Sequence, residues 1–179
     1  MVKSNKVFIA TSIDGFIADE DGGIGWLDTI PEINTIDTGY ADFIANIDAL
    51  VMGRMTFEKV LSFGIDWPYT KMVYVVSSKL KSVPDELEGK VTLLSGELDD
   101  ILAIIHDRVH LQLYIDGGSL IQGFLKEDKI NEMVITVIPI LLGAGIPLFG
   151  ALSSALQFEC VKTNHFLGSV VQNHFVRKR

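Results

Sequence analysis

Three short segments of the sequence combine side chains and backbone groups that suit a phosphate. Gly53-Arg54-Met55-Thr56 follows an apolar run, and its glycine would let a ligand approach the backbone. The N–H groups of the next helix would face an anion, and Arg54 could add a charge-assisted contact. Asp116-Gly117-Gly118-Ser119 places two adjacent glycines before another helix and leaves N–H groups facing outward. Ser77-Ser78-Lys79 offers two hydroxyls and an ammonium, a set that suits a phosphate monoester.

Each of these segments also has a plainer interpretation. The first could be a strand-to-helix turn with a surface arginine, the second a flexible glycine turn and the third a solvated turn. The full G-x-G-x-x-G fingerprint of a dinucleotide site is absent, because Gly23-Ile24-Gly25 has Asp28 where the third glycine belongs and follows no strand. Position favours the phosphate interpretation, since all three segments follow predicted strands and would lie at one edge of a sheet.

The elements that must position these segments alternate between strands and helices. Short apolar runs rich in β-branched residues predict strands at 7–11, 49–52, 72–76, 91–94, 111–115 and 130–138. Apolar residues spaced by three and four predict helices at 40–47, 56–61, 98–109 and 120–125, whereas segment 19–31 has no helical period and predicts a loop. Segments 156–162 and 170–176 predict an antiparallel pair. We therefore expect one α/β domain, a mostly parallel sheet covered on both faces.

The composition excludes several classes of protein. With 179 residues, 48% hydrophobic and 21% charged, the chain fits one globular domain and cannot be disordered or fibrous. A net charge of −8 disfavours nucleic acid as a partner. The single cysteine, Cys160, excludes an internal disulfide and a cysteine-rich zinc site, and we expect it in the core. The longest apolar region, 133–149, contains Pro139 and Pro147, which argues against a membrane span and makes the cytoplasm the expected compartment.

Four segments in a fixed order resemble a known family. Residues 10–18 (ATSIDGFIA) are similar to the first strand and loop of the dihydrofolate reductase-like fold, and residues 52–58 (MGRMTFE) match its element M-G-R-x-T-[FYW]-E. Residues 114–118 (YIDGG) match the later glycine turn, and residues 139–149 (PILLGAGIPLF) are similar to P-x-L-L-G-x-G-x-P-L-F. The chain resembles most closely the RibD C-terminal reductase domain of riboflavin biosynthesis and its stand-alone relatives. The deaminase half of that bifunctional enzyme has no counterpart, because its H-x-E…P-C-x-x-C signature is absent.

This resemblance implies a three-layer dihydrofolate reductase-like fold over residues 1–179, with a mixed, mostly parallel eight-stranded sheet and antiparallel C-terminal strands. It also implies NADPH as the cofactor. The nicotinamide would lie between Ala10 and Ile17, and the adenosine 2′-phosphate would meet Ser77, Ser78 and Lys79. The pyrophosphate, the adjacent ribose and the nicotinamide side would be contacted by Gly53, Arg54, Thr56, Gly117, Gly118, Ser119, Leu120 and Ile121.

Two carboxylates are candidates for relaying the proton that accompanies hydride addition. The resemblance places Asp37 near the catalytic carboxylate of folate reductases, yet Asp37 could equally be an exposed residue whose charge favours a helix dipole. Asp14 lies near the nicotinamide end of the first strand and could instead orient substrate or shape an Asp-Gly turn. His106 and His110 have the spacing of metal ligands, but exposed histidines near a helix end are the plainer interpretation, and we expect no metal.

The sequence therefore predicts a cytoplasmic reductase that transfers a hydride from NADPH to a small heterocyclic substrate, pterin- or aminopyrimidine-like, or to a carbonyl compound. The substrate would lie between the Asp14 loop, the loop 19–31 and the first helix, where Trp26 could be a lid or a hydrophobic plug. Two alternatives stay open, an NADPH-binding module without turnover and a true dihydrofolate reductase. The expected partners are a small molecule and a second copy of the chain in a homodimer, with no nucleic acid and no membrane.

Overall fold

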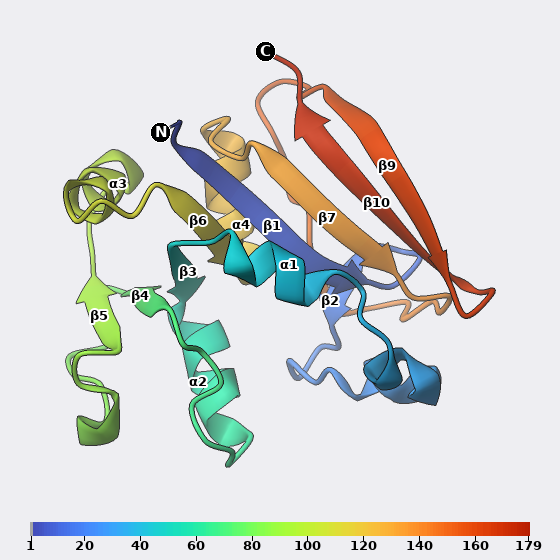
Figure 1. The fold of residues 1–179 in the computed structure, drawn as a ribbon, viewed down its shortest axis with the longest axis horizontal. Helices are drawn as coiled ribbons and strands as arrows, with labels where there is room; N and C mark the ends of the chain where they lie inside the picture. Colours follow the sequence, from blue (N-terminus) through green and yellow to red (C-terminus); the bar gives the residue numbers. More distant parts are fainter. Residues whose placement is uncertain (1) are drawn as a thin grey trace.

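Eight strands form one continuous sheet within residues 2–179, the part of the chain that the computed structural model describes (Figure 1). In spatial order the strands are β5 (Val91–Leu94), β4 (Met72–Val76), β3 (Ala49–Gly53), β6 (Gln112–Asp116), β1 (Ser4–Thr11), β7 (Glu132–Val137), β10 (Val170–Arg177) and β9 (Phe158–Phe166). The first six run parallel, and β10 is antiparallel to both β7 and β9. The predicted mixed sheet with an antiparallel C-terminal pair is confirmed.

The six parallel strands all end on the same side of the sheet, which we call the carboxyl edge. Along this edge the last strand residues follow in the order Leu94, Val76, Gly53, Asp116, Thr11 and Val137. The loops that leave a parallel sheet at its carboxyl edge are the ones that meet ligands. Segments that lie far apart in the sequence are therefore brought side by side where a site can form.

Helices cover both faces of the sheet. They are α1 (Tyr40–Ala45), α2 (Arg54–Ser62), α3 (Leu98–Asp107) and α4 (Gly118–Lys126). Successive strand residues point to opposite faces, so Leu50 and Met52 pack on the side of α1 and α2, whereas Ala49 and Val51 pack on the side of α3 and α4 (Figure 1). This arrangement explains why β3 and β4 are apolar at nearly every position. Within residues 2–179, every helix is too short or too polar to cross a membrane.

Smaller elements lie beside the carboxyl edge and were not predicted. β2 (Phe16–Ala18) pairs with β8 (Ile146–Pro147) in a separate two-stranded sheet. The described chain also has 3-10 helices, η1 (Gly25–Thr29), η2 (Pro31–Thr35) and η3 (Asp85–Leu87). The expectation that 19–31 is entirely loop is therefore wrong at η1. Tertiary packing of the buried Trp26 against Ile138 and Val170 accompanies this turn, which has no 3.6-residue period to find.

Most predicted strands and helices are present, with differences at their ends. β4 and β5 span the predicted residues, but β1 begins earlier, at Ser4, because the polar Asn5 is bonded: its side-chain amide donates to the Lys129 carbonyl at 2.7 Å. α3 ends at Asp107 rather than at 109, since Val109 has a φ of 66°, which no α-helix contains. Cys160 is exposed rather than in the core, because β9 is the outer strand of the sheet.

Candidate functional site

A pocket of about 370 Å³ lies where β3, β4 and β5 reach the carboxyl edge. Its lining consists of Arg54, Val76, Ser77, Ser78, Lys79, Ser95 and Gly96. Two cations and several hydroxyls thus converge beside the N-terminus of α2, and this is a set of groups that binds phosphate. The structure brings together Arg54 and the Ser77–Lys79 segment, which the sequence presented as separate candidates.

The pocket is held in shape by its own polar groups. The Ser77 hydroxyl oxygen accepts hydrogen bonds from the N–H groups of Lys79 at 3.1 Å and Leu80 at 3.0 Å, so the turn after β4 is fixed while the hydroxyl proton can still be donated. Ser78 and Lys79 are exposed. Arg54 donates to the Glu58 carboxylate at 2.6 Å, so an anion would be bound by its remaining N–H groups or would compete with Glu58.

Ser95 and Gly96 are part of this pocket but were missed at the sequence level. They directly follow β5, a strand that was predicted correctly, and a hydroxyl directly after a strand was part of the signal that identified Ser77 and Ser78. What the sequence could not show is that β5 is the neighbour of β4. Without that strand order, nothing ties Ser95 to the other serines.

The glycine turn between β6 and α4 is closely packed against two other predicted segments. Gly117 has a φ of 92°, and a Cβ at this position would collide with the Thr56 hydroxyl of α2. A Cβ on Gly118 would lie 2.9 Å from Ile17 Cδ1 and 3.3 Å from the Pro147 carbonyl oxygen. Both positions therefore require glycine, and the turn brings Thr56 and Ile17 to one place. The turn also begins α4, whose first N–H groups have no side-chain cap and suit a pyrophosphate.

The remaining predicted cofactor residues occupy this neighbourhood to different degrees. Ser119 is exposed and Leu120 is partly buried, whereas the Ile121 side chain is fully buried in the core, so a ligand could reach Ile121 only through its backbone. Ala10 is partly buried against a cluster that contains Trp26 and Ile138. Trp26 is 8% exposed, which fits the plug interpretation of this side chain rather than the lid. The cofactor contacts of all these residues stay predictions.

Asp116 occupies the centre of the carboxyl edge and was not selected from the sequence as a site residue. It is the last residue of β6, the strand between β3 and β1. Burial raises the pKa of its carboxyl to about 6. The Gly117 N–H, which donates to Oδ1 at 2.8 Å, acts to lower this pKa. A partly buried carboxyl that titrates near neutrality is a candidate for proton transfer. The available signal was an acidic residue directly after a buried apolar strand.

The charge of Asp116 affects the pKa of three tyrosines. Burial, and after it the charge of Asp116, raises the pKa of Tyr40, Tyr69 and Tyr114 above the usual tyrosine value. Tyr114 donates its hydroxyl hydrogen to the Phe8 carbonyl at 2.9 Å, so its position is fixed. These side chains come from α1, from the segment after α2 and from β6.

The two carboxylates predicted as catalytic both accept hydrogen bonds from backbone N–H groups. Asp14 accepts hydrogen bonds from the Ser12 hydroxyl at 2.6 Å and from the N–H groups of Leu142 and Gly143 at 3.1 and 2.7 Å. These bonds, led by the one from Ser12, lower its pKa, so Asp14 is ionised at neutral pH. Asp37 is exposed and accepts the Gly39 N–H at 2.8 Å, just before α1. Their catalytic roles stay predictions, and the geometry favours Asp116 as the proton-carrying group.

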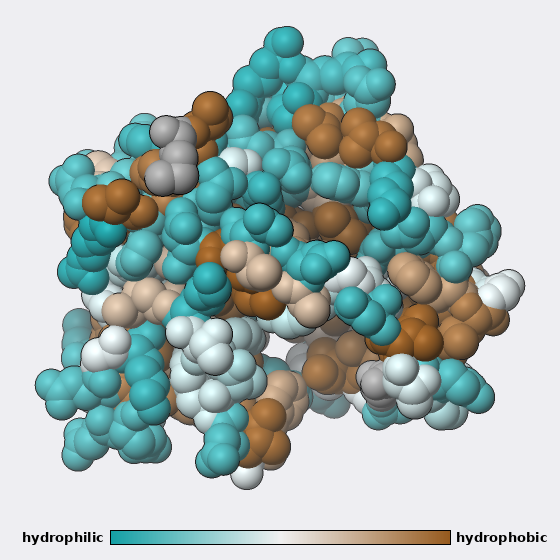
Figure 2. Space-filling view, viewed as in Figure 1, coloured by the Kyte–Doolittle hydropathy of each residue, from teal (hydrophilic) through white to brown (hydrophobic). Residues whose placement is uncertain are grey.

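The molecular surface carries a hollow on the face drawn in Figure 2. Figure 2 shows the hollow below α1, between α2 and the segment 19–36 that follows β2 in Figure 1. Tyr40 is the first residue of α1. Ile115 packs on the side of α3 and α4, so its neighbour Asp116 lies on the opposite face of the sheet, which α1 and α2 cover. After the roles that the sequence predicts, we name the part of the carboxyl edge formed by β6, β1 and β7 the substrate half, and the part formed by β5, β4 and β3 the cofactor half. The glycine turn after β6, which is predicted to contact the cofactor, lies where the two halves meet.

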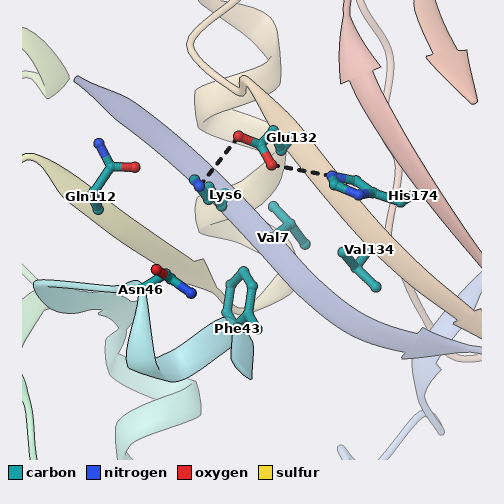
Figure 3. Close-up of a pocket in the computed structure, with 8 residues that line it drawn as sticks. All are labelled: Lys6, Val7, Phe43, Asn46, Gln112, Glu132, Val134 and His174. Atoms are coloured by element: carbon teal, nitrogen blue, oxygen red, sulfur yellow. Dashed lines mark hydrogen bonds and ion pairs between the residues drawn. The ribbon is translucent and has the colours of Figure 1, made fainter. Parts of the chain in front are cut away.

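Another pocket, of about 310 Å³, lies on the sheet face beside α1 and away from the carboxyl edge. Its charged groups satisfy one another: Figure 3 shows the Glu132 carboxylate between Lys6, 3.3 Å away, and His174, 3.1 Å away. Phe43 and Val134 supply apolar walls. Because its charges are paired internally and it lacks a helix N-terminus or glycine turn, this pocket is a weaker candidate for the reaction site.

The strand order and the glycine-bounded edge define a reductase-like α/β domain with the dihydrofolate reductase fold. A dihydrofolate reductase of Enterococcus faecalis superimposes with a TM-score of 0.68 at 15% identity, over 98% of this chain and 97% of the other. The chain matches the RibD C-terminal domain family over residues 6–171, and it belongs to that family.

Relatives from three bacteria support this assignment. The uncharacterized protein YwjB of Bacillus subtilis (strain 168) is 38% identical over 99% of both chains. A crystal structure from Shewanella sp. PV-4, of a protein provisionally assigned to riboflavin biosynthesis, matches with a TM-score of 0.94 at 51% identity, covering 98% of this chain and 99% of the other. The bifunctional deaminase/5-amino-6-(5-phosphoribosylamino)uracil reductase of Thermotoga maritima matches in fold, with a TM-score of 0.73 at 16% identity over 99% of this chain and 57% of the other.

Proposed function

We propose that this protein is an NADPH-dependent reductase that transfers a hydride to a small heterocyclic or carbonyl substrate. The observation that carries the proposal is the pocket of Arg54, Ser77, Ser78 and Lys79 at the carboxyl edge. A phosphate bound there would lie at one end of an edge that continues through the glycine turn toward Asp116. This order suits an extended dinucleotide whose reactive ring reaches the substrate half.

In this proposal each group of residues has a distinct task. NADPH supplies the hydride, and the protein supplies binding, orientation and electrostatics. Ser77, Ser78 and Lys79 would hold the 2′-phosphate, and the backbone at Gly117 and Gly118 would lie against the pyrophosphate. These positions fit the group, because they lie at the N-terminus of α4, where no side chain caps the free N–H groups.

Asp116 would hold and deliver the proton that hydride addition requires. Its Oδ1 accepts the Gly117 N–H, which leaves Oδ2 as the oxygen that can carry a proton toward a substrate nitrogen or oxygen. A carboxyl with a pKa of about 6 is protonated in part of the molecules near neutral pH, so it can act without an external acid.

The test is a titration with NADPH followed by tryptophan fluorescence, with NADH as the comparison, and then NADPH oxidation over a panel of pterins, aminopyrimidines and carbonyl compounds. We expect NADPH to bind more tightly than NADH and one substrate class to be turned over. Failure to bind NADPH would contradict the proposal. Tight binding without any turnover would leave the binding module as the function, and efficient turnover of dihydrofolate would identify a folate reductase.

We also propose that the protein forms a homodimer. Leu141, Phe149, Leu152 and Val161 are large apolar side chains that are each more than 40% exposed, near the two-stranded sheet and on the outer strand β9. Burial of such side chains against a second copy would remove apolar surface from water. Analytical ultracentrifugation at micromolar concentration tests this, with a monomeric sedimentation coefficient as the contrary result.

A further inference from the structure

Basic residues are missing from two long stretches of the chain. No lysine or arginine occurs between Lys6 and Arg54, or between Lys129 and Lys162. The first stretch holds nine carboxylates: Asp14, Asp19, Glu20, Asp21, Asp28, Glu32, Asp37, Asp42 and Asp48. Besides parts of the strands β1, β3 and β9, these two stretches form the turn after β1, β2, the segment 19–36, α1, β7 and the segment after β7. Asp48 is the exception among the carboxylates, because it lies before β3 and accepts the N–H groups of Leu111 and Gln112 away from the carboxyl edge. The turn after β1, β2 and the segment after β7 lie at the carboxyl edge of the substrate half.

The four basic residues that border these stretches are accounted for elsewhere. Arg54 lines the pocket of the cofactor half and is paired with Glu58. Lys6 lies near the start of β1, away from the carboxyl edge, and is paired with Glu132. Lys129 is paired with Asp99 and Glu127.

Lys162 is the last of the four and is exposed on the outer strand β9. None of these residues supplies a cation to the substrate half. The central carboxyl of that half, Asp116, is instead accompanied by Tyr40 and Tyr69, whose hydroxyls are uncharged at neutral pH.

We infer that the substrate of the proposed reductase is an unphosphorylated heterocycle, neutral or cationic, and that the substrate half discriminates against phosphate esters. A phosphate dianion is bound in proteins by cations, by converging N–H groups and by hydroxyls. The cofactor half has such a set, with Arg54 and Lys79 as its cations. The substrate half has the N–H groups of the glycine turn after β6, but carboxylates such as Asp14 and Asp116 where the cofactor half has cations. A phosphate brought to this half would lose its hydration and meet charges of its own sign. The inference rests on the proposed function, because it assigns the acidic half to the substrate.

Matched pairs of compounds test this inference. The protein saturated with NADP⁺, which cannot donate a hydride, is titrated calorimetrically with 5-amino-6-(ribosylamino)uracil and its 5′-phosphate, with neopterin and neopterin phosphate, and with riboflavin and its 5′-phosphate. We expect the unphosphorylated member of a pair to bind roughly five- to tenfold more tightly at low salt, and the preference to shrink at about 0.5 M salt as charge repulsion is screened.

A pair of charge-reversal variants locates the effect. Glu20 is exposed in the segment next to the hollow, where the turn is held by Asp19, whose Oδ1 accepts the N–H groups of Asp21 and Gly23. Glu20→Lys should reduce the preference several-fold. Asp107→Lys changes the net charge equally, but it lies at the far end of α3, away from the carboxyl edge, and should leave the preference unchanged.

Three results would overturn the inference: tighter binding of the phosphorylated members, equal effects of both variants, or no binding of any unphosphorylated member. The proposed function is judged separately, by the NADPH titration. Binding of NADPH together with a preference for phosphate esters would contradict only the present inference. Loss of NADPH binding would contradict the proposed function itself.

Discussion

The two halves of the carboxyl edge present opposite chemistry on one continuous sheet. The cofactor half combines Arg54 and Lys79 with serine hydroxyls, whereas the substrate half combines Asp14 and Asp116 with tyrosine rings. The net charge of −8 describes neither half. It argues against an extended polyanion such as nucleic acid, which responds to the broad field of a surface, but a compact dinucleotide responds to a few groups at one place. Local placement of charge therefore decides which ligands each half can take.

Replacement of Asp116 should give the largest effect on catalysis. Asp116→Asn keeps an oxygen for the Gly117 N–H but cannot deliver a proton, so we expect kcat to fall about 100-fold or more, with binding of NADPH little changed. In the unmodified protein, kcat should fall as pH rises through about 6, because the protonated carboxyl is the active form. Steady-state NADPH oxidation against pH measures both. If Asp14→Asn or Asp37→Asn abolishes turnover while Asp116→Asn does not, the assignment is reversed.

The same substitution should stabilise the fold. Burial makes the folded protein hold the Asp116 proton more tightly than the unfolded chain does, so the free energy of unfolding falls as pH rises from the ordinary value of 3.8 to about 6 and stays lower above it. Asp116→Asn removes this cost, and we expect a gain of about 2 kcal/mol at neutral pH. Urea unfolding at pH 4 and pH 7 measures it, since the gain should be small at pH 4. If Asp116→Asn lowers the stability at both pH values, the buried carboxylate does not destabilise the fold.

Gly117 joins the two halves, and its replacement should damage the edge between them. Gly117→Ala places a methyl group against the Thr56 hydroxyl at a φ of 92°, so we expect a loss of about 2 kcal/mol in stability and weaker NADPH binding. Gly123→Ala, in the open interior of α4, is the matched control and should be neutral or slightly stabilising. Adding Thr56→Ala to Gly117→Ala should recover part of the loss, and no recovery would mean that the collision is not its cause.

Lys79 should act on the cofactor half alone. Because this side chain is exposed and screened, we expect Lys79→Ala to raise the Kd for NADPH only about three- to tenfold and to leave that for NADH unchanged. Lys90→Ala, an exposed lysine directly before β5 at the opposite end of the strand, is the control. Fluorescence titrations with both cofactors provide the comparison. If the variant weakens the binding of NADPH and of NADH equally, the assignment of the 2′-phosphate to this pocket is wrong.

Sequence patterns predicted the sheet better than the site. The apolar run 72–76 is a complete strand in the structure, because burial on both faces favours apolar residues at nearly every position. The run 91–94 is also a complete strand, although β5 is the outermost strand and contains Thr92. The short pairing of β2 with β8 gave no pattern, since two or three residues are too few to show a period. η1 escaped notice for a related reason, because its turn accompanies packing of Trp26 against residues distant in the sequence.

The site was predicted where a motif marks it and missed where only strand order does. Gly117, Thr56 and Ile17 come from three motifs, and the structure places them in one neighbourhood. Ser95 becomes part of a pocket only because β5 lies beside β4. Asp116 was visible in the motif, but its raised pKa depends on burial by elements that the sequence does not align.

Replacement of Asp14 should have the smallest effect on kcat, and it distinguishes a structural from a chemical role for this carboxylate. Its carboxylate links the turn after β1 to the N–H groups of Leu142 and Gly143, so it acts on the position of a loop. Asp14→Asn leaves a single acceptor oxygen, and we expect faster amide hydrogen exchange at these two residues, with kcat reduced no more than a few-fold. In the unmodified protein the lowered pKa keeps these bonds intact at neutral pH, and they weaken only as pH falls through that lowered value. Unchanged exchange combined with lost turnover would instead make Asp14 a chemical participant, and the substrate half would then contain two working carboxylates rather than one.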